Sequence, residues 1–339
     1  MELDLVNGEG FAMGPTSEVE STLPSPADRA LDRAQQLGSG LTESDPELVY
    51  RLKPGAAVDV TILGRRLTMD VDAFGCRPVI GQNDIGEKSF SAYGCSLTYG
   101  LAIAAEDTFC SLLQGTFPTW RMENYGVNGY STVQNLIHLR RNSRFFASDY
   151  VSFCWFDKHP LRNVAAPNYV QLLMRFLDRT GQRDTAQTSQ PCARLDADGE
   201  LQLATFQFPR WDLYEVDYAD FQPDPYYLDL VCAKVLTRAK SIVDGYGGHF
   251  FVTALFGSMS DALRRMLAEN GVPLLDASLE GLEYTCWPDD LHPNARANAH
   301  YAEKIRDYLM AQEQARGGEP RMMADVAGGT SNLQQGNTR

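Results

Sequence analysis

The sequence of 339 residues is short of basic side chains, with 30 Lys and Arg against 44 Asp and Glu. At a net charge of −14 the chain lacks the clustered positive surface that nucleic-acid phosphates require, so we expect no nucleic-acid partner. An acidic surface mainly favours solubility. No apolar run reaches the ~18 residues that span a bilayer, so we also expect no membrane span.

Paired cysteines are missing as well. The seven cysteines are scattered and form no Cys-x-x-Cys pair, so we expect neither a zinc site nor an iron–sulfur cluster. Their odd number is simplest to explain by a reduced protein. The first 22 residues have no basic region followed by an apolar segment, as a secretory signal has. A cytoplasmic protein is the expectation, and the alternative is a longer precursor with an export signal.

Composition divides the chain into four segments. The first is rich in Gly, Ser, Pro and acidic residues, and it has one expected short helix near Ala27–Leu37. In the second, Val58–Leu63 and Leu67–Val71 flank a Gly-Arg-Arg turn and predict a β-hairpin. The segments are a flexible arm (1–44), a β-rich extension (45–88), an α/β domain (89–315) and a disordered tail (316–339).

Strand and helix patterns alternate throughout the third segment. This order predicts a mostly parallel sheet with helices on both faces. The expected strands are Ser89–Gly94, Trp120–Tyr125, Tyr150–Phe156, His249–Phe256 and Val272–Leu275. The expected helices are Leu101–Leu113, Thr132–Asn142, Asn168–Arg179, Tyr226–Tyr246, Ser260–Asn270 and Ala295–Glu313.

An insertion at about 181–223 interrupts this alternation. Within it, Leu195–Phe208 alternates like a hairpin. An aromatic group in and just after the insertion either packs it onto the core or lines an acyl or sugar pocket. The group comprises Trp211, Tyr214, Tyr218, Phe221, Tyr226 and Tyr227.

Ser96, Gly129 and His159 each come just after a predicted strand. Ligands of parallel sheets bind at the carboxyl ends of the strands, so we expect these residues to share one site. Ser96 opens a helical stretch after Gly94, as a nucleophilic serine on a tight turn does. An ordinary helix N-cap serine is the alternative.

Two further motifs suit the same chemistry. Asn124–Thr132 holds two glycines after a strand, so backbone N–H groups can point into a cavity as an oxyanion hole requires. An ordinary Gly/Asn turn is the alternative. In Asp289-Asp290-Leu291-His292, a carboxylate three positions before His292 can orient it as a general base. A structural histidine at a helix start is the alternative.

Together these blocks resemble the SGNH (GDSL-type) hydrolase family over roughly residues 89–308. The resemblance implies a flavodoxin-like three-layer α/β/α sandwich without a cofactor or metal. It implies Ser96 as nucleophile, His292 as base and Asp289 as its partner. It also implies the N–H groups of Ser96 and Gly129 as oxyanion donors.

Two blocks depart from the family pattern. Cys95 stands where the family usually has Asp, which leaves Cys95 as an alternative nucleophile. After Tyr150–Phe156 the family has Gly-x-Asn-Asp, whereas this chain has Asp157-Lys158-His159 and then Asn163. A neutral His159 can donate to an oxyanion, so we expect His159 as the third donor with Asn163 behind it. A solvated surface histidine is the alternative.

The motifs thus predict a serine ester hydrolase that forms an acyl-enzyme on Ser96 and acts on a small-molecule, carbohydrate or lipid ester. One alternative is an acyltransferase that uses the same acyl-enzyme. Another is a non-catalytic binding protein on the hydrolase scaffold. The sequence leaves the substrate and the oligomeric state open.

Overall fold

The computed structural model describes residues 40–179, 189–207 and 223–317. The expected helix near Ala27–Leu37, and nearly all of the predicted arm and tail, lie outside this part of the chain. So do the aromatic residues of the insertion that precede Tyr226. None of the described helices is both long and apolar enough to cross a membrane.

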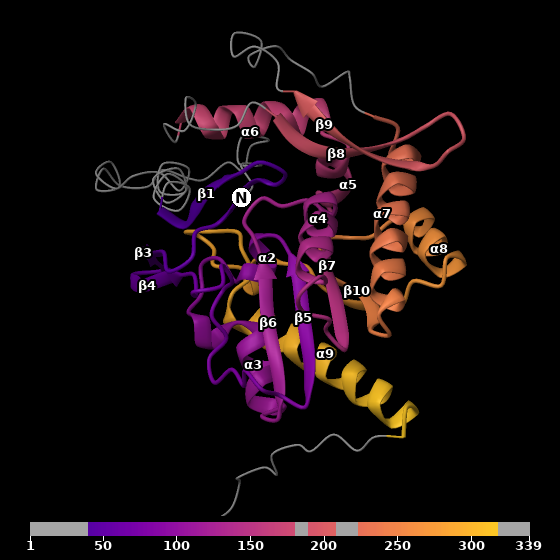
Figure 1. Ribbon diagram of the computed structural model, residues 1–339. Helices are drawn as coiled ribbons and strands as arrows, with labels where there is room; N and C mark the ends of the chain where they lie inside the picture. The colour runs from indigo at the N-terminus through magenta and orange to yellow at the C-terminus, as the bar shows by residue number, and fades with distance from the viewer. Residues whose placement is uncertain (1–39, 180–188, 208–222, 318–339) are drawn as a thin grey trace, which may run out of the picture.

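A five-stranded parallel sheet forms the centre of the molecule (Figure 1). Its spatial order is β11-β10-β7-β5-β6, which is the flavodoxin-like order 2-1-3-4-5 when these strands are numbered along the chain. The predicted parallel sheet is therefore confirmed. The strands are β5 (Lys88–Gly94), β6 (Trp120–Gly126), β7 (Tyr150–Phe156), β10 (His249–Phe256) and β11 (Leu274–Leu279).

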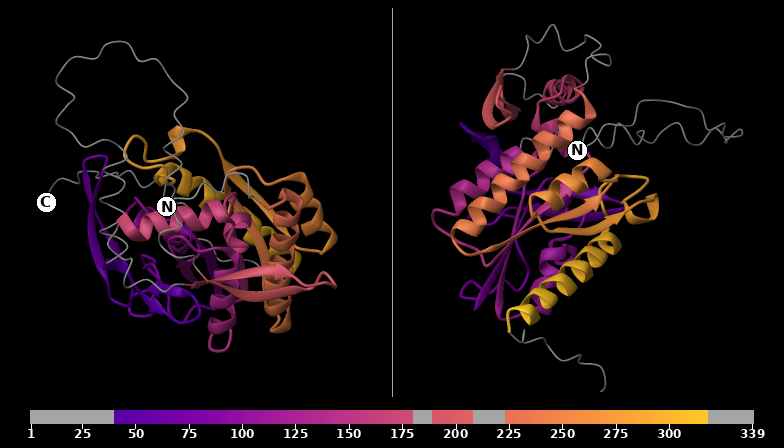
Figure 2. Two further views of the ribbon diagram at one scale, coloured as in Figure 1. Left: turned by 90° about the horizontal axis from the view of Figure 1, so that it is seen from above. Right: turned by 90° about the vertical axis from the view of Figure 1, so that its right-hand side faces the viewer.

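Helices cover both faces of the sheet and give three layers, as Figure 2 shows for α7 and α9. Continuous apolar strands such as β7, with all its residues buried, require cover on both sides. One face is packed by α4 (Thr132–Asn142), α7 (Pro225–Gly245) and α8 (Asp261–Glu269). The other is packed by α3 (Phe109–Thr116) and α9 (Ala295–Ala315).

The helix expected at Leu101–Leu113 is the main error in the predicted elements. The chain instead forms the short α2 (Ser96–Tyr99), a 3-10 turn (Ala105–Asp107) and then α3. Gly100 ends α2 in the left-handed conformation with φ 76°, which a helix cannot continue through. Thr108 then caps α3 by accepting a hydrogen bond from the Ser111 N–H.

The insertion contains the predicted hairpin, but with an earlier start. Its strands are β8 (Ser189–Leu195) and β9 (Leu201–Gln207), paired antiparallel. Two helices precede it, α5 (His159–Asn163) and α6 (Pro167–Arg179), of which only α6 is predicted. Figure 1 shows the hairpin beyond the end of the sheet where α2 lies.

The N-terminal extension forms two hairpins. They comprise β1 (Thr42–Asp45) with β2 (Val49–Leu52), and β3 (Ala57–Ile62) with β4 (Arg65–Asp70), so the predicted β3–β4 hairpin is confirmed. Their apolar side chains form a cluster of their own with Tyr99, Val127, Tyr130 and Cys286. The extension therefore covers the loops that follow β5 and β6.

All seven cysteines are buried and none forms a disulfide. Cys110 and Cys154, expected in the core, are at most 1% exposed. Burial raises the pKa of both thiols, because the interior disfavours the thiolate. They act as small apolar side chains.

Arg77 joins the extension to the segment that carries Ser96. Its guanidinium is buried, lies 4.8 Å from the centre of the Tyr99 ring and pairs with Asp70 of β4. It also donates to the Ile103 carbonyl, over 3.2 Å. The Tyr99 hydroxyl donates to the Asp70 carbonyl over 2.9 Å, so hairpin and α2 share one network.

We predict that Arg77→Met lowers the free energy of unfolding by about 3 kcal/mol, because it leaves buried carbonyls without a donor and Asp70 without its cation. Arg66→Met on the same hairpin is the matched control. Its pair with Asp59 is exposed, so the loss should be much smaller than that of Arg77→Met. Urea unfolding of both variants measures this, and equal losses would contradict the assigned role of Arg77.

Candidate active site

Ser96 is the first residue of α2, directly after the end of β5. Close packing fixes this turn, since a Cβ on Gly94 would lie 1.9 Å from Thr98 Oγ1. A Cβ on Gly126 would lie 2.2 Å from the Tyr99 nitrogen. Glycine is therefore required at the ends of both β5 and β6, and Ser96 is held at the carboxyl end of the sheet.

His292 lies in the loop between β11 and α9, which is tied together by backbone hydrogen bonds. The Cys286 N–H donates to the His292 carbonyl over 3.0 Å, and the Asp290 N–H donates to the Cys286 carbonyl over 3.0 Å. Asn294 caps α9 and also donates to the carbonyls of Glu283 and Thr285. These bonds hold the histidine ring in one place.

Ser96, His292 and Asp290 form a connected set of side chains. Ser96 Oγ lies 2.9 Å from His292 Nε2, and His292 Nδ1 lies 2.5 Å from Asp290 Oδ1. A carboxylate only accepts, so Nδ1 carries the proton and Nε2 accepts from the Ser96 hydroxyl. Ser96 is 1% exposed and His292 8% exposed, so the contacts are shielded from bulk water.

The structure places Asp290, and not Asp289, beside His292, which corrects the expectation from the family pattern. Asp290 Oδ1 also accepts the backbone N–H of His292 over 2.8 Å. This local Asx turn brings the carboxylate two residues before the histidine onto its ring. Asp289 Oδ2 instead accepts the N–H of Leu63 over 2.7 Å.

The sequence contained a signal for Asp290 that the family spacing obscured. Asp side chains commonly accept the N–H two residues later, and Asp290-Leu291-His292 has that spacing. Asp289 fastens the turn between β3 and β4 to this loop. Asp289 therefore connects the extension to the His292 loop.

Gly129 lies in the loop after β6 with φ +78°, a conformation that favours glycine. Two tyrosine hydroxyls form hydrogen bonds with this loop. The Tyr50 hydroxyl of β2 donates to the Asn128 carbonyl over 2.7 Å, and the Tyr169 hydroxyl of α6 donates to the Gly129 carbonyl over 3.4 Å. With the carbonyls engaged, the loop has a fixed orientation.

Tyr50 and Tyr169 also lie near the turn that carries Ser96. The pKa of Tyr169 is raised, mainly by burial. The charge of Arg162 opposes this rise in pKa, and Cys95 adds to it. Burial likewise raises the pKa of Tyr50, with smaller effects from Tyr169, Arg162 and Cys95. Sequence reasoning missed both tyrosines, because they come from segments outside the blocks it examined.

The N–H groups of Ser96 and Gly129 make no hydrogen bond within the described ranges. Backbone N–H groups at the ends of neighbouring strands, left without partners, are what an anion-binding pocket needs. β5 and β6 are adjacent in the sheet, so the loops that carry these two donors are neighbours.

His159 begins α5, three positions after the last residue of β7, which also neighbours β5. It is fully buried, and neither ring nitrogen has a partner among the described residues. Burial, helped by the charge of Arg162, holds its pKa well below 6.5. The alternative of a solvated surface histidine is excluded, and the ring is neutral with one N–H available to donate.

Asn163, expected behind His159, makes two hydrogen bonds with the start of α4. Its Oδ1 accepts from the Thr132 hydroxyl over 2.7 Å and from the Val133 N–H over 3.2 Å. It therefore holds the first turn of α4, the helix that follows the Gly129 loop. Its Nδ2 has no partner within the described part of the chain.

The other histidines have structural surroundings. His138 on α4 contacts the rings of Tyr93, Tyr125 and Tyr130, and burial lowers its pKa to about 4. His249 Nε2 lies 2.8 Å from the Tyr308 hydroxyl. Residues 40–179, 189–207 and 223–317 contain no group of three or more His, Cys, Asp or Glu side chains placed to hold a metal.

Several solved structures of esterases and lipolytic proteins are similar to this chain. The psychrotrophic esterase EstA from Pseudoalteromonas sp. is 11% identical with a TM-score of 0.42, covering 67% of this chain and all of its own. The acetylxylan esterase Axe2 from Geobacillus stearothermophilus is 11% identical with a TM-score of 0.36, covering 67% of this chain and 96% of its own.

A member of the lipolytic G-D-S-L family from Veillonella parvula is 13% identical with a TM-score of 0.33. It covers 66% of this chain and 99% of its own. No family model matches the sequence, and no curated protein matches it.

We predict that His159 stays neutral as the pH falls from 8 through 6.5, because its folded pKa lies well below the 6.5 of an ordinary histidine. Below pH 6.5 the unfolded chain then binds a proton that the folded chain does not, so stability falls with falling pH. NMR of the His159 ring nitrogens measures the titration. A midpoint near 6.5 would contradict the burial of the ring.

Proposed function

We propose that this protein hydrolyses carboxylic esters through an acyl-enzyme on Ser96. The contact between Ser96 Oγ and His292 Nε2, with Asp290 on Nδ1, carries the proposal. A serine hydroxyl is a weak nucleophile unless an adjacent base takes its proton, and the base is effective only in the correct tautomer. Both conditions are met by these contacts.

In the first half-reaction Ser96 Oγ attacks the ester carbonyl carbon while His292 Nε2 takes the hydroxyl proton. Asp290 stabilises the resulting imidazolium and remains ionised. The tetrahedral intermediate then breaks its bond to the alcohol oxygen. His292 gives its proton to that oxygen, and the alcohol dissociates. The acyl group remains bound to Ser96.

Water completes the cycle by the reverse use of the same groups. His292 takes a proton from water, whose oxygen attacks the acyl carbon. The second tetrahedral intermediate breaks its bond to Ser96 Oγ, which recovers its proton from His292. The products are a carboxylic acid and a free enzyme.

The oxyanion of both intermediates would be bound by the N–H groups of Ser96 and Gly129, with a neutral His159 as the third donor. Two observations support these roles. The three residues follow three adjacent strands, and their donors have no other partner among the described residues. Losing one such donor typically slows a reaction by about 100-fold or more. Asn163 would act indirectly by holding α4.

Cys95 is not proposed as the nucleophile, because the His292 ring contacts Ser96 Oγ. Cys95 is 1% exposed and precedes α2 as its N-cap. The intact Ser96–His292–Asp290 contacts also favour catalysis over a binding protein without activity. Small-molecule esters, including carbohydrate and lipid esters, remain the proposed substrate class.

We predict that Asp290→Asn lowers kcat for an activated ester such as p-nitrophenyl acetate by on the order of 1,000-fold or more, because the amide favours the wrong histidine tautomer. Asp289→Asn is the matched control one residue away. It should lower kcat by less than about tenfold, because its carboxylate accepts from Leu63 rather than from His292.

Thermal unfolding of both variants verifies that each is folded. A larger loss in Asp289→Asn than in Asp290→Asn would overturn the assignment of the acid. Unchanged kcat in both would show that neither carboxylate supports His292 in catalysis.

A further inference from the structure

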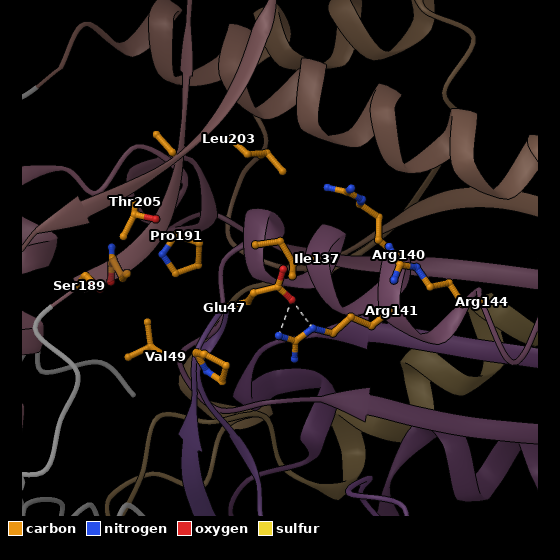
Figure 3. A pocket seen from close by; sticks show the side chains of 13 residues that line it. Glu47, Val49, Ile137, Arg140, Arg141, Arg144, Ser189, Pro191, Leu203 and Thr205 are labelled. Carbon is orange, nitrogen blue, oxygen red and sulfur yellow. Dashed lines mark hydrogen bonds and ion pairs between the residues drawn. The ribbon is translucent and has the colours of Figure 1, made fainter.

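A pocket lies away from Ser96, between α4, the β1–β2 turn and the β8–β9 hairpin (Figure 3). Its volume is about 450 Å³, which is within the size range of small-molecule sites. None of its lining residues belongs to the Ser96–His292 site. The pocket therefore needs an explanation of its own.

Two walls of this pocket, α4 and the β1–β2 turn, are attached to one another. Arg141 of α4 makes two hydrogen bonds of 2.7 and 2.9 Å to Asp45, and it pairs with Glu47 as Figure 3 shows. Gln134 donates to the Leu48 carbonyl over 2.9 Å. The turn is thus fixed on α4, so these two walls of the pocket have a defined position.

Asp45 and Arg141 neutralise one another. Burial alone would raise the pKa of Asp45, but hydrogen bonds from Arg141, Leu48 and Glu47 outweigh it and lower the pKa to about 2. The Asp45 carboxylate is therefore already paired with Arg141. It does not neutralise the other cations of the pocket.

Two further arginines, Arg140 and Arg144, line the pocket without a carboxylate partner in the described part of the chain. Figure 3 shows both side chains extending from the α4 side of the pocket. They are four positions apart on α4 and its C-terminal turn, a spacing at which like charges repel. In a chain of net charge −14, two arginines that have no carboxylate partner among residues 40–179, 189–207 and 223–317 favour an anion in this pocket.

Part of the pocket surface is apolar. Val49, Ile137, Pro191 and Leu203 line it together with the small polar side chains of Ser189 and Thr205. Such a lining suits the uncharged part of an organic molecule. A purely inorganic anion would leave it uncovered.

A neighbouring pocket of about 420 Å³ continues past Arg140 and Leu203, which line both. Lys234 and Arg238 of α7 line this second pocket. The positive charge therefore extends along α4 and α7, and Glu200 near Lys234 offsets only part of it.

We propose that the pocket between α4 and the β8–β9 hairpin binds a small organic anion. A phosphate or carboxylate group would lie against Arg140 and Arg144, with an apolar portion against Val49, Ile137 and Pro191. The proposal is independent of the esterase chemistry at Ser96, since the two sites share no residue. It gives the insertion that carries β8 and β9 a binding role.

The test is isothermal titration of the full chain with phenyl phosphate, benzoate and the uncharged benzyl alcohol. We expect saturable binding of at least one anion and none of benzyl alcohol. Phenyl phosphate alone would identify a phosphate site, and benzoate alone a carboxylate site. Each arginine removed should weaken binding by about tenfold, the value of one hydrogen bond to a charged group.

Arg140→Gln, Arg144→Gln and their combination are compared with Arg265→Gln. Arg265 is exposed on α8 and lines neither pocket, so its variant removes the same charge elsewhere. Equal affinity in the double variant and in Arg265→Gln would overturn the proposal. So would equal binding of benzyl alcohol, or no saturable binding of either anion to wild type.

Discussion

The contact between Ser96 and His292 depends on the parallel sheet, because it joins side chains 196 positions apart in the sequence. Parallel strands bring their carboxyl ends to one edge, so loops from distant parts of the chain meet there. Ser96 follows β5, the Gly129 loop follows β6 and His159 follows β7. His292 lies after the edge strand β11. The order of the strands thus decides which side chains become neighbours.

The N-terminal extension fixes the positions of the loops that the sheet brings together. Arg77 links β4 to the segment carrying Ser96, Tyr50 grips the loop of Gly129, and Asp289 binds the β3–β4 turn to the His292 loop. Reacting groups must be held within a fraction of an ångström of their working positions. The extension acts on the serine, glycine and histidine loops together, which explains why its apolar cluster is shared with them.

Sequence periodicity predicted the strands, most helices and their parallel order, because buried apolar runs and caps are local signals. From the strand ends it expected Ser96, Gly129 and His159 to share one site, and the motif around His292 supplied the expected base. The predictions were wrong where tertiary contacts determine the local structure. Asp290 replaced Asp289 beside His292 through an Asx turn, and the helix expected from Leu101 was split by the left-handed Gly100. The hydrogen bonds from Tyr50 and Tyr169 to the Gly129 loop, and the pocket lined by Arg140 and Arg144, form between segments distant in sequence. No local sequence pattern predicts such contacts.

The central claim is that His292 activates Ser96. The most direct measurement is intact mass after exposure to a fluorophosphonate probe, for the wild type and for Ser96→Ala. We predict a single adduct on the wild type and none on the variant, because only an activated serine displaces the fluoride. A folded wild type without an adduct, or an adduct that persists in Ser96→Ala, would contradict the account.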